Sequence, residues 1–204
     1  SNHAKVGAMI AYKTVYPYTC NPKDVIAAEK EKRKEYFFSD VQVRGKYPDY
    51  IWQYSRYPVH ENTTAEYFQV GDDMFPVLVR ELKQAKKYIF IEYFIINDGV
   101  MWQTILNILE KKAAEGVDVR LIYDGFGCLT TLPHKYYEEL RAKGIKCQVF
   151  NPFRPLLNII QNNRDHRKLC IIDGWVGFTG GINLADEYIN EIERFGYWKD
   201  TGVR

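Results

Sequence analysis

The stretch that indicates the fold most clearly spans residues 165–200 and reads DHRKLCIIDGWVGFTGGINLADEYINEIERFGYWKD. Its Asp-Gly dipeptide at Asp173 is a strong hairpin signal, because apolar runs stand on both sides of it. The second run ends in a glycine pair, Gly180 and Gly181. Asn183 then stands at the predicted start of a helix, with an acidic residue three positions later, as in a capping box. The stretch therefore predicts a strand, a tight turn, a second strand, a glycine pair and a helix.

The same stretch carries residues that suit phosphate chemistry. His166 and Lys168 are two positions apart, so on a strand their side chains point to the same face. The imidazole can act as a nucleophile, and the ammonium can stabilise charge on phosphoryl oxygens. Backbone N–H groups at Gly180 and Gly181 can approach a phosphate closely, and a helix beginning near Asn183 would direct its positive end to the same place. The pattern therefore favours phosphoryl transfer.

Each of these residues also has an ordinary structural explanation. A single histidine on a strand is usually structural, Lys168 also fits a surface position, and Asn183 fits a simple helix cap. We group Asp173 with His166 and Lys168 as a catalytic candidate, although even in that group we expect it to act largely as a turn residue. The ordered pattern H-x-K-x4-D, formed by His166, Lys168 and Asp173, is harder to attribute to chance, because it lies in the strand, turn and glycine context described above.

Upstream of this stretch, helical and extended patterns alternate. Apolar residues at helical spacing predict three helices, at residues 71–85, 100–115 and 133–143. Apolar runs predict strands at residues 88–96, 117–123 and 145–150. Strands that alternate with helices of this length predict an α/β fold with a parallel or mixed sheet. In such sheets, ligands gather at the carboxyl ends of the strands.

Two carboxylates of these strands are candidate functional groups. Glu92 lies in a strand that is otherwise apolar enough to be buried, so its carboxylate requires a partner or must face the site. Asp124 stands at the end of the next strand, beside Gly125, and is placed similarly. Both residues remain open to a purely structural interpretation.

Composition narrows the class of protein. The chain has 204 residues, 46% hydrophobic and 26% charged, which is typical of a globular domain. The net charge of +2 gives no general basic field that would attract nucleic acid. No apolar run approaches the ~20 residues that span a bilayer. The cysteines form no C-x-x-C pair and lack zinc-ligand spacing, so we predict free, mostly buried thiols at Cys20, Cys128, Cys147 and Cys170.

Residues 1–60 differ in composition from residues 61–204. The run EKEKRKE at Glu29–Glu35 predicts a solvated helix, with a juxtamembrane segment attracted to anionic lipid as the alternative. We therefore predict an amino-terminal linker or juxtamembrane segment at 1–60 and a catalytic domain at 61–204.

The motif H-x-K-x4-D with its following glycines and asparagine resembles that of the phospholipase D superfamily, and the wider sequence resembles bacterial cardiolipin synthases. The resemblance extends from Tyr57 to the end of the chain and rests on YPVHENTTAEYF, EYFII, NPFRP, NNRDHRK, GFTGGINLADEYI and WKDT. It implies α-β-α layers around a mixed, largely parallel sheet, of which residues 61–204 would form the first of two halves.

The resemblance also implies a mechanism. A histidine attacks the phosphodiester of phosphatidylglycerol and forms a phosphohistidine, and the headgroup hydroxyl of a second phosphatidylglycerol then gives cardiolipin and glycerol. No metal and no cofactor are implied. His166 would be the nucleophile or the acid/base, Lys168 and Asn183 would bind phosphate, and Asp200 would orient the histidine unless it is an ordinary surface residue. Arg164 and Arg167 are further candidates for contact with lipid phosphates.

The chain contains one H-x-K-x4-D motif, whereas the family builds its site from two. The second motif is expected either from a missing second half or from a homodimer partner. Family members also usually carry amino-terminal membrane helices. We therefore expect action on phosphatidylglycerol at an anionic membrane surface, on the cytoplasmic face of the cell membrane, and little activity from this chain alone.

Three other functions remain open. Attack by water instead of a lipid hydroxyl would make a phospholipase D-type hydrolase, which the motif does not distinguish. A dimeric single-motif nuclease is disfavoured by the balanced charge, so no nucleic-acid partner is expected. A non-catalytic module that binds anionic lipid is disfavoured by the intact His166 and Lys168.

Overall fold

The computed structural model describes residues 50, 53–54, 63–152 and 163–204. The chain divides into two compact units, Ser1–Thr64 and Ala65–Arg204. All the elements described below belong to the second unit. The charge run at Glu29–Glu35 lies outside the described residues, so the helix expected there stays a prediction.

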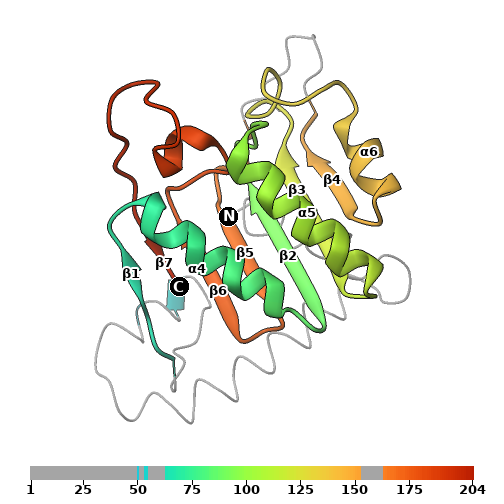
Figure 1. Ribbon diagram of the computed structural model, residues 1–204, viewed down its shortest axis with the longest axis horizontal. Coiled ribbons are helices and arrows are strands. Elements are labelled where there is room, and N and C mark those ends of the chain that lie inside the picture. The colour runs from blue at the N-terminus through green and yellow to red at the C-terminus, as the bar shows by residue number, and fades with distance from the viewer. Residues whose placement is uncertain (1–49, 51–52, 55–62, 153–162) are drawn as a thin grey trace. The chain divides into compact units, whose positions relative to one another are not determined.

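A mixed sheet forms the centre of the second unit, with the strand order β1-β7-β6-β5-β2-β3-β4 (Figure 1). The strands are β1 (Tyr67–Phe68), β2 (Tyr88–Tyr93), β3 (Asp118–Asp124), β4 (Lys146–Phe150), β5 (Leu169–Ile172), β6 (Val176–Gly180) and β7 (Gly202–Val203). The predicted α/β class and mixed sheet are confirmed. Parallel pairing is confined to β2–β3 and β3–β4, a smaller share than predicted. The reason is that β5 pairs antiparallel with β2, and the hairpin at Asp173 adds β6 antiparallel to β5.

The helices α4 (Gly71–Gln84), α5 (Val100–Ala114) and α6 (Tyr136–Ala142) match the three predicted helices. In Figure 1, α4 and α5 cross in front of the sheet. The α6 helix joins them through a hydrogen bond from Trp102 Nε1 to Tyr136 Oη at 2.9 Å. Among the described residues the helices cover this one face, and a second helical layer stays a prediction.

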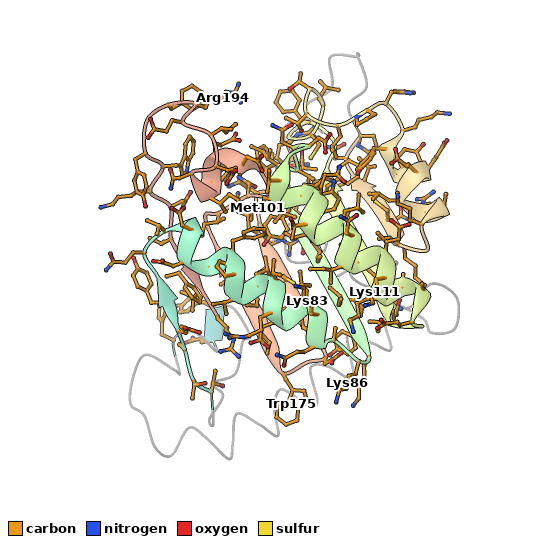
Figure 2. All side chains as sticks on the ribbon, viewed as in Figure 1. Lys83, Lys86, Met101, Lys111, Trp175 and Arg194 are labelled. Atoms are coloured by element: carbon orange, nitrogen blue, oxygen red, sulfur yellow. The ribbon has the colours of Figure 1, made fainter. Side chains whose placement is uncertain are left out.

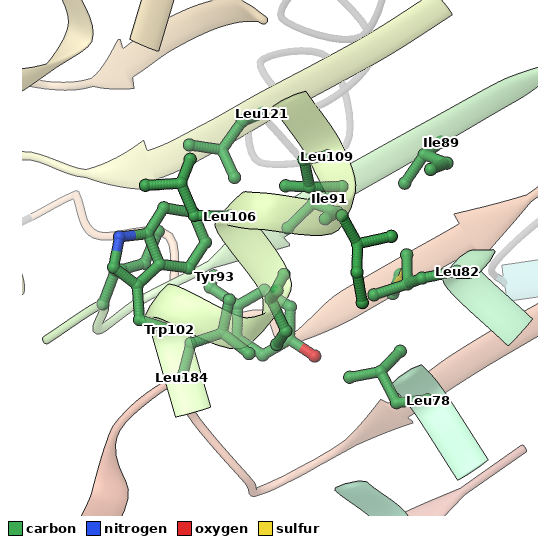
Figure 3. Packing of buried hydrophobic residues seen from close by; sticks show 14 of the residues in the cluster. Leu78, Leu82, Ile89, Ile91, Tyr93, Trp102, Leu106, Leu109, Leu121 and Leu184 are labelled. Carbon is green, nitrogen blue, oxygen red and sulfur yellow. The ribbon is translucent and has the colours of Figure 1, made fainter. Parts of the chain in front are cut away.

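The core lies between this face of the sheet and the helices, as Figure 3 shows. Ile89, Ile91 and Tyr93 alternate along β2 and are buried, because successive strand residues point to opposite faces. Four residues of the predicted apolar face of α5 are also buried: Trp102, Ile105, Leu106 and Leu109. Each fully buried side chain of this size contributes roughly 2 kcal/mol of hydrophobic free energy. This core holds the ends of β2 and β3 in a fixed place.

The prediction of a helix that starts near Asn183 is wrong. The structure has instead a 3-10 helix of four residues, η3 (Asp186–Ile189). The Asp186 carboxylate accepts hydrogen bonds from the N–H groups of Val100 at 2.9 Å and Met101 at 2.8 Å. It therefore caps α5, a helix 85 residues earlier in the chain, and not a helix of its own.

The cysteine prediction is confirmed for three residues. Cys128, Cys147 and Cys170 are free and buried, and burial raises the pKa of each thiol to about 12. Cys20 lies outside the described residues. None of the helices in the described part of the chain has the length and apolar character needed to cross a membrane.

Candidate active site

His166 and Lys168 lie where the carboxyl ends of β2 and β3 meet the beginning of β5. Leu169, the first residue of β5, pairs with Glu92 near the end of β2. The backbone N–H of Asp165 donates to Asp124, the last residue of β3, at 3.0 Å. The pair thus lies at the carboxyl end of the parallel strands, the position expected for a ligand site in such sheets.

The imidazole and the ammonium are held against each other and against one aromatic ring. His166 is exposed, whereas Lys168 is 4% exposed. Lys168 Nζ lies 3.2 Å from His166 Nδ1 and donates to the His166 carbonyl oxygen at 2.8 Å. The Phe94 ring lies 4.6 Å from the imidazole and 5.4 Å from Lys168 Nζ. An accessible imidazole therefore stands beside a buried cation.

Burial controls the electrostatics of Lys168. Loss of solvation lowers the pKa of its ammonium, and the nearby carboxylates of Asp200 and Asp165 only partly offset this effect. A buried ammonium has few water partners and interacts strongly with a negative phosphoryl oxygen, because the effective dielectric constant is low. Lys168 is therefore well suited to bind a phosphoryl group that reacts at His166.

A carboxyl pair bridged by an arginine lies next to the motif. Arg167 Nε lies 2.9 Å from Asp165 Oδ1, and its Nη2 lies 2.5 Å from Glu92 Oε1. Burial, followed by a hydrogen bond to Asp165, raises the pKa of Glu92 to about 8. Burial also acts to raise the pKa of Asp165, but hydrogen bonds from Glu92 and Arg167 outweigh it and leave that pKa lowered. The raised pKa of Glu92 and the lowered pKa of Asp165 favour a proton on Glu92 and a negative charge on Asp165.

Asp124 fixes the segment that leads into the motif. It is fully buried, at 0% exposure. One carboxylate oxygen accepts the N–H groups of Phe126 and Gly127 at 2.8 and 2.9 Å and Arg164 Nη1 at 3.2 Å, and the other accepts the N–H of Asp165. These contacts make Asp124 a positioning residue for the segment before His166.

Asp173, which we grouped with the catalytic residues, lies at the opposite end of β5 from His166. Its carboxylate accepts the N–H groups of Lys86, Lys87 and Tyr88 at 2.8, 2.7 and 2.9 Å. It therefore joins the β5–β6 turn to the start of β2. These contacts favour the largely structural role expected for this residue, and its place among the catalytic residues stays a prediction.

The predicted phosphate-binding groups are engaged within the protein. Asn183 Oδ1 accepts the Ile95 N–H at 3.0 Å, and its Nδ2 donates to Tyr188 Oη at 2.8 Å. The Gly181 N–H donates to the Thr201 carbonyl oxygen at 3.0 Å. A Cβ on Gly180, whose φ is 155°, would collide with that same carbonyl. These contacts favour structural roles, and phosphate binding by Asn183, Gly180 and Gly181 stays a prediction.

Asp200 shares the site with Lys168. Its carboxylate raises the pKa of Lys168 and packs where Gly181 has no side chain. One of its oxygens accepts the Thr201 N–H at 2.9 Å. Orientation of His166 by Asp200 stays a prediction.

Two features of the site were not predicted from the sequence. Phe94 follows β2 and gave no sign that its ring would contact His166 and Lys168. The contact of Glu92 and Asp165 with one arginine, Arg167, joins carboxylates 73 positions apart, and only the burial of Glu92 suggested that a partner must exist.

Comparison with known proteins agrees with this geometry. A family model described as cardiolipin synthase, PLD-like domain, matches residues 78–193, more than half of the chain. Cardiolipin synthase 2 of Staphylococcus epidermidis is 42% identical over 135 residues, which cover 66% of this chain and 28% of the relative. Cardiolipin synthase of Oceanobacillus iheyensis is 38% identical over 144 residues, which cover 71% of this chain and 30% of that relative. A Streptococcus mutans protein without an assigned function is 46% identical over 191 residues, covering 89% and 41%.

Solved structures support the fold. NucT from Helicobacter pylori superimposes with a TM-score of 0.51 at 16% identity, covering 69% of this chain and 83% of that one. Phosphatidylserine synthase of Haemophilus influenzae gives a TM-score of 0.50 at 17% identity, and the match covers 68% of this chain and 33% of that one. The chain spans between 28% and 41% of the length of the three sequence relatives above. By the match over residues 78–193, the chain belongs to the family of phospholipase D-like domains of cardiolipin synthases.

Proposed function

We propose that this domain supplies one half of the active site of a phosphatidyltransferase that joins two phosphatidylglycerols into cardiolipin and glycerol. The observation that carries the proposal is the exposed imidazole of His166 held beside the buried ammonium of Lys168. Two of the relatives bear the name cardiolipin synthase, which favours a lipid phosphodiester over other phosphodiesters.

In the first step, an imidazole nitrogen of His166 attacks the phosphorus of one phosphatidylglycerol. An N–P bond forms, and the bond between phosphorus and the headgroup glycerol oxygen breaks. The leaving oxygen takes a proton from an acid that this half of the site does not supply. Lys168 stabilises the charge on the phosphoryl oxygens in the transition state.

The contact between Lys168 and Nδ1 of His166 bears on which nitrogen attacks. While the ammonium donates to Nδ1, the single ring proton of a neutral imidazole resides on Nε2, which then has no lone pair for attack. A phosphate oxygen that accepts the Lys168 hydrogen bond releases Nδ1 to carry the ring proton. Substrate binding would thereby turn Nε2 into the nucleophile.

In the second step, the headgroup hydroxyl of another phosphatidylglycerol attacks the phosphohistidine. The hydroxyl gives its proton to the base, the N–P bond breaks, and His166 is regenerated. One phosphodiester replaces another, so the exchange needs no nucleotide to drive it. Water in place of the hydroxyl would give phosphatidic acid, the product of a hydrolase.

The acid and base of both steps belong to a second motif. We place it in a second phospholipase D-like half, with a homodimer partner as the alternative source. The substrate lies in an anionic membrane, and the proposed location of the reaction is the cytoplasmic face of the cell membrane.

The test uses the product of the complete gene on phosphatidylglycerol vesicles, with a chelator present and lipid products read by mass spectrometry. Wild type is compared with His166→Ala and with the matched control His134→Ala, an exposed histidine outside the site. Cardiolipin from wild type and His134→Ala, but not from His166→Ala, supports the proposal. Phosphatidic acid instead identifies a hydrolase, and absence of any lipid turnover contradicts a lipid substrate.

A further inference from the structure

Large exposed apolar side chains concentrate at the end of the domain that carries His166. In the described part of Ala65–Arg204, nine such side chains are exposed. Six of them stand on three connections at this end, and we call them the apolar rim: Val100, Phe126, Leu129, Ile192, Phe195 and Tyr197. The other three are Trp175 in the β5–β6 turn and Tyr67 and Val203 on β1 and β7.

The three connections meet around the carboxyl ends of β2 and β3. Val100 begins α5 and is held by Asp186 of η3. Phe126 follows β3, and its N–H donates to Asp124. The segment after η3 leaves the same place, because Leu184 bridges Ile96 just beyond β2. Figure 1 shows the β3–α6 connection and the segment after η3 at the same end of the domain.

One part of the rim contacts the segment that leads into the motif, and the other is tied to the first turn of α4. The Arg164 guanidinium lies 5.3 Å from the centre of the Phe126 ring, and Arg164 precedes His166 by two residues. The segment after η3 is tied back by Asn190, whose Nδ2 donates to Asp72 Oδ1 at 2.9 Å and whose Oδ1 accepts the Trp198 N–H at 2.6 Å. The rim is therefore fixed relative to the reacting groups.

The chemistry of the rim fits a lipid interface. Phe195 is 72% exposed and Tyr197 58% exposed, although both are aromatic and water gives their rings no favourable contact. Single exposed apolar residues are ordinary, but a cluster around a site marks an interaction surface. A guanidinium stands over an aromatic ring in each part, Arg164 over Phe126 and Arg194 over Phe195 at 5.1 Å. Rings in the upper acyl region with cations at the phosphate level are typical of an interfacial contact.

We infer that the apolar rim inserts into the interface of a phospholipid bilayer and so brings His166 to the plane of the phosphodiesters. This inference rests on the proposed function and adds how the site reaches its substrate. Glu191 and Glu193 lie beside Arg194 in the same segment, so apolar insertion contributes more than attraction to anionic lipid. Binding to vesicles will therefore depend only weakly on salt.

The test measures binding of the 204-residue chain to phosphatidylglycerol–phosphatidylcholine vesicles by flotation, which requires no catalysis. The double variant Phe195→Ser with Tyr197→Ser should bind at least about tenfold more weakly than wild type. The matched control is Trp175→Ser, which removes an aromatic side chain that is 89% exposed at the opposite end of the domain, where Figure 2 places it relative to Arg194. It should bind within about twofold of wild type.

A second measurement does not depend on loss of binding. Phe195→Trp should gain fluorescence that vesicles with brominated acyl chains quench, whereas Tyr67→Trp, on β1, should gain fluorescence that they do not quench. Equal binding by the double variant and Trp175→Ser, or no quenching at position 195, would overturn the inference. So would a rim variant that changes the sedimentation of a dimer in the absence of lipid, because a second copy would then cover the rim.

The failure of this inference is separable from failure of the proposed function. His166→Ala should abolish turnover by the product of the complete gene and leave flotation of the 204-residue chain unchanged. If the wild type shows no turnover but flotation still depends on the rim, the proposed function fails and the rim remains a lipid-binding surface. If turnover is normal but flotation does not depend on the rim, only the inference about the rim fails.

Discussion

At the residue scale, the site combines an exposed imidazole with a buried cation. The imidazole of His166 is open to solvent, and Lys168 Nζ stays 3.2 Å from it because the ammonium stands over the Phe94 ring and donates to the His166 carbonyl oxygen. The lowered pKa of Lys168 shows that burial weakens the hold on its proton, so the charge of the site depends on the surrounding carboxylates.

Replacement of Lys168 by Met should lower kcat/KM by about 10²- to 10³-fold, because it removes the group that stabilises charge on the phosphoryl oxygens. The measurement is initial-rate cardiolipin formation by the product of the complete gene. Lys199→Met, an exposed lysine in the segment after η3, serves as the control and should retain activity. A Lys168→Met enzyme within threefold of wild type would contradict the proposed role.

Glu92 should make the folded state less stable as the pH rises. Its pKa is about 8 in the folded protein against an ordinary value of 4.5 for a glutamate, so between these values the folded state binds more protons than the unfolded state. The unfolding free energy therefore falls with rising pH, by at most about 1.4 kcal/mol per unit. In Glu92→Gln this contribution disappears.

The check is urea denaturation of the wild type and Glu92→Gln at several values between pH 5 and 8. The exposed Glu191→Gln provides the control and should keep the wild-type slope. An unchanged slope in Glu92→Gln would mean that Glu92 is charged in the folded state throughout this range.

At the element scale, two acidic residues hold together segments that are distant in sequence. Asp186 caps α5, and Asp173 ties the β5–β6 turn to the start of β2. Both accept hydrogen bonds from backbone N–H groups that have no partner in their own element. A carboxylate at such a position contributes most to the stability of the fold. The acidic residue of H-x-K-x4-D thus supports the sheet on which His166 stands.

Asp173→Ala should destabilise the fold by about 2 kcal/mol, because three backbone N–H groups lose a charged acceptor. Urea denaturation measures this loss. The activity per folded molecule should fall much less than in Lys168→Met, since Asp173 stands at the opposite end of β5 from His166. A large loss of kcat with unchanged stability would instead indicate a direct catalytic role.

At the scale of the whole molecule, the chain carries one motif, and the apolar rim lies at the same end of the domain. The chain spans 28–41% of the length of its relatives. In the proposed function a second half completes the site, so that half and the bilayer would both approach this end.

The 204-residue chain alone should therefore form no cardiolipin from phosphatidylglycerol at any protein concentration, because no second motif protonates the leaving glycerol. The measurement is product formation across a hundredfold range of concentration, with the complete gene product as the positive control. Turnover that rises with the square of the concentration would show instead that two copies complete the site.

The sequence by itself determined the class of fold and the candidate pair His166 and Lys168. Alternation of helical and extended apolar patterns predicted α4, α5, α6 and the strands between them, because these periodicities are local. The Asp-Gly turn at Asp173 predicted the β5–β6 hairpin in the same way. The spacing of His166 and Lys168 placed both side chains together, since two residues on an extended segment share a face.

Only the tertiary structure decided the partners of the remaining residues. Asn183 contacts Ile95, Asp186 contacts Val100, and Glu92 contacts Arg167, all across more than 70 positions of the chain. The antiparallel half of the sheet and the apolar rim likewise arise from segments brought together by the core. Local sequence patterns specify which face of an element is buried, but not which distant segment packs against its end, so these contacts are fixed only when the whole domain folds.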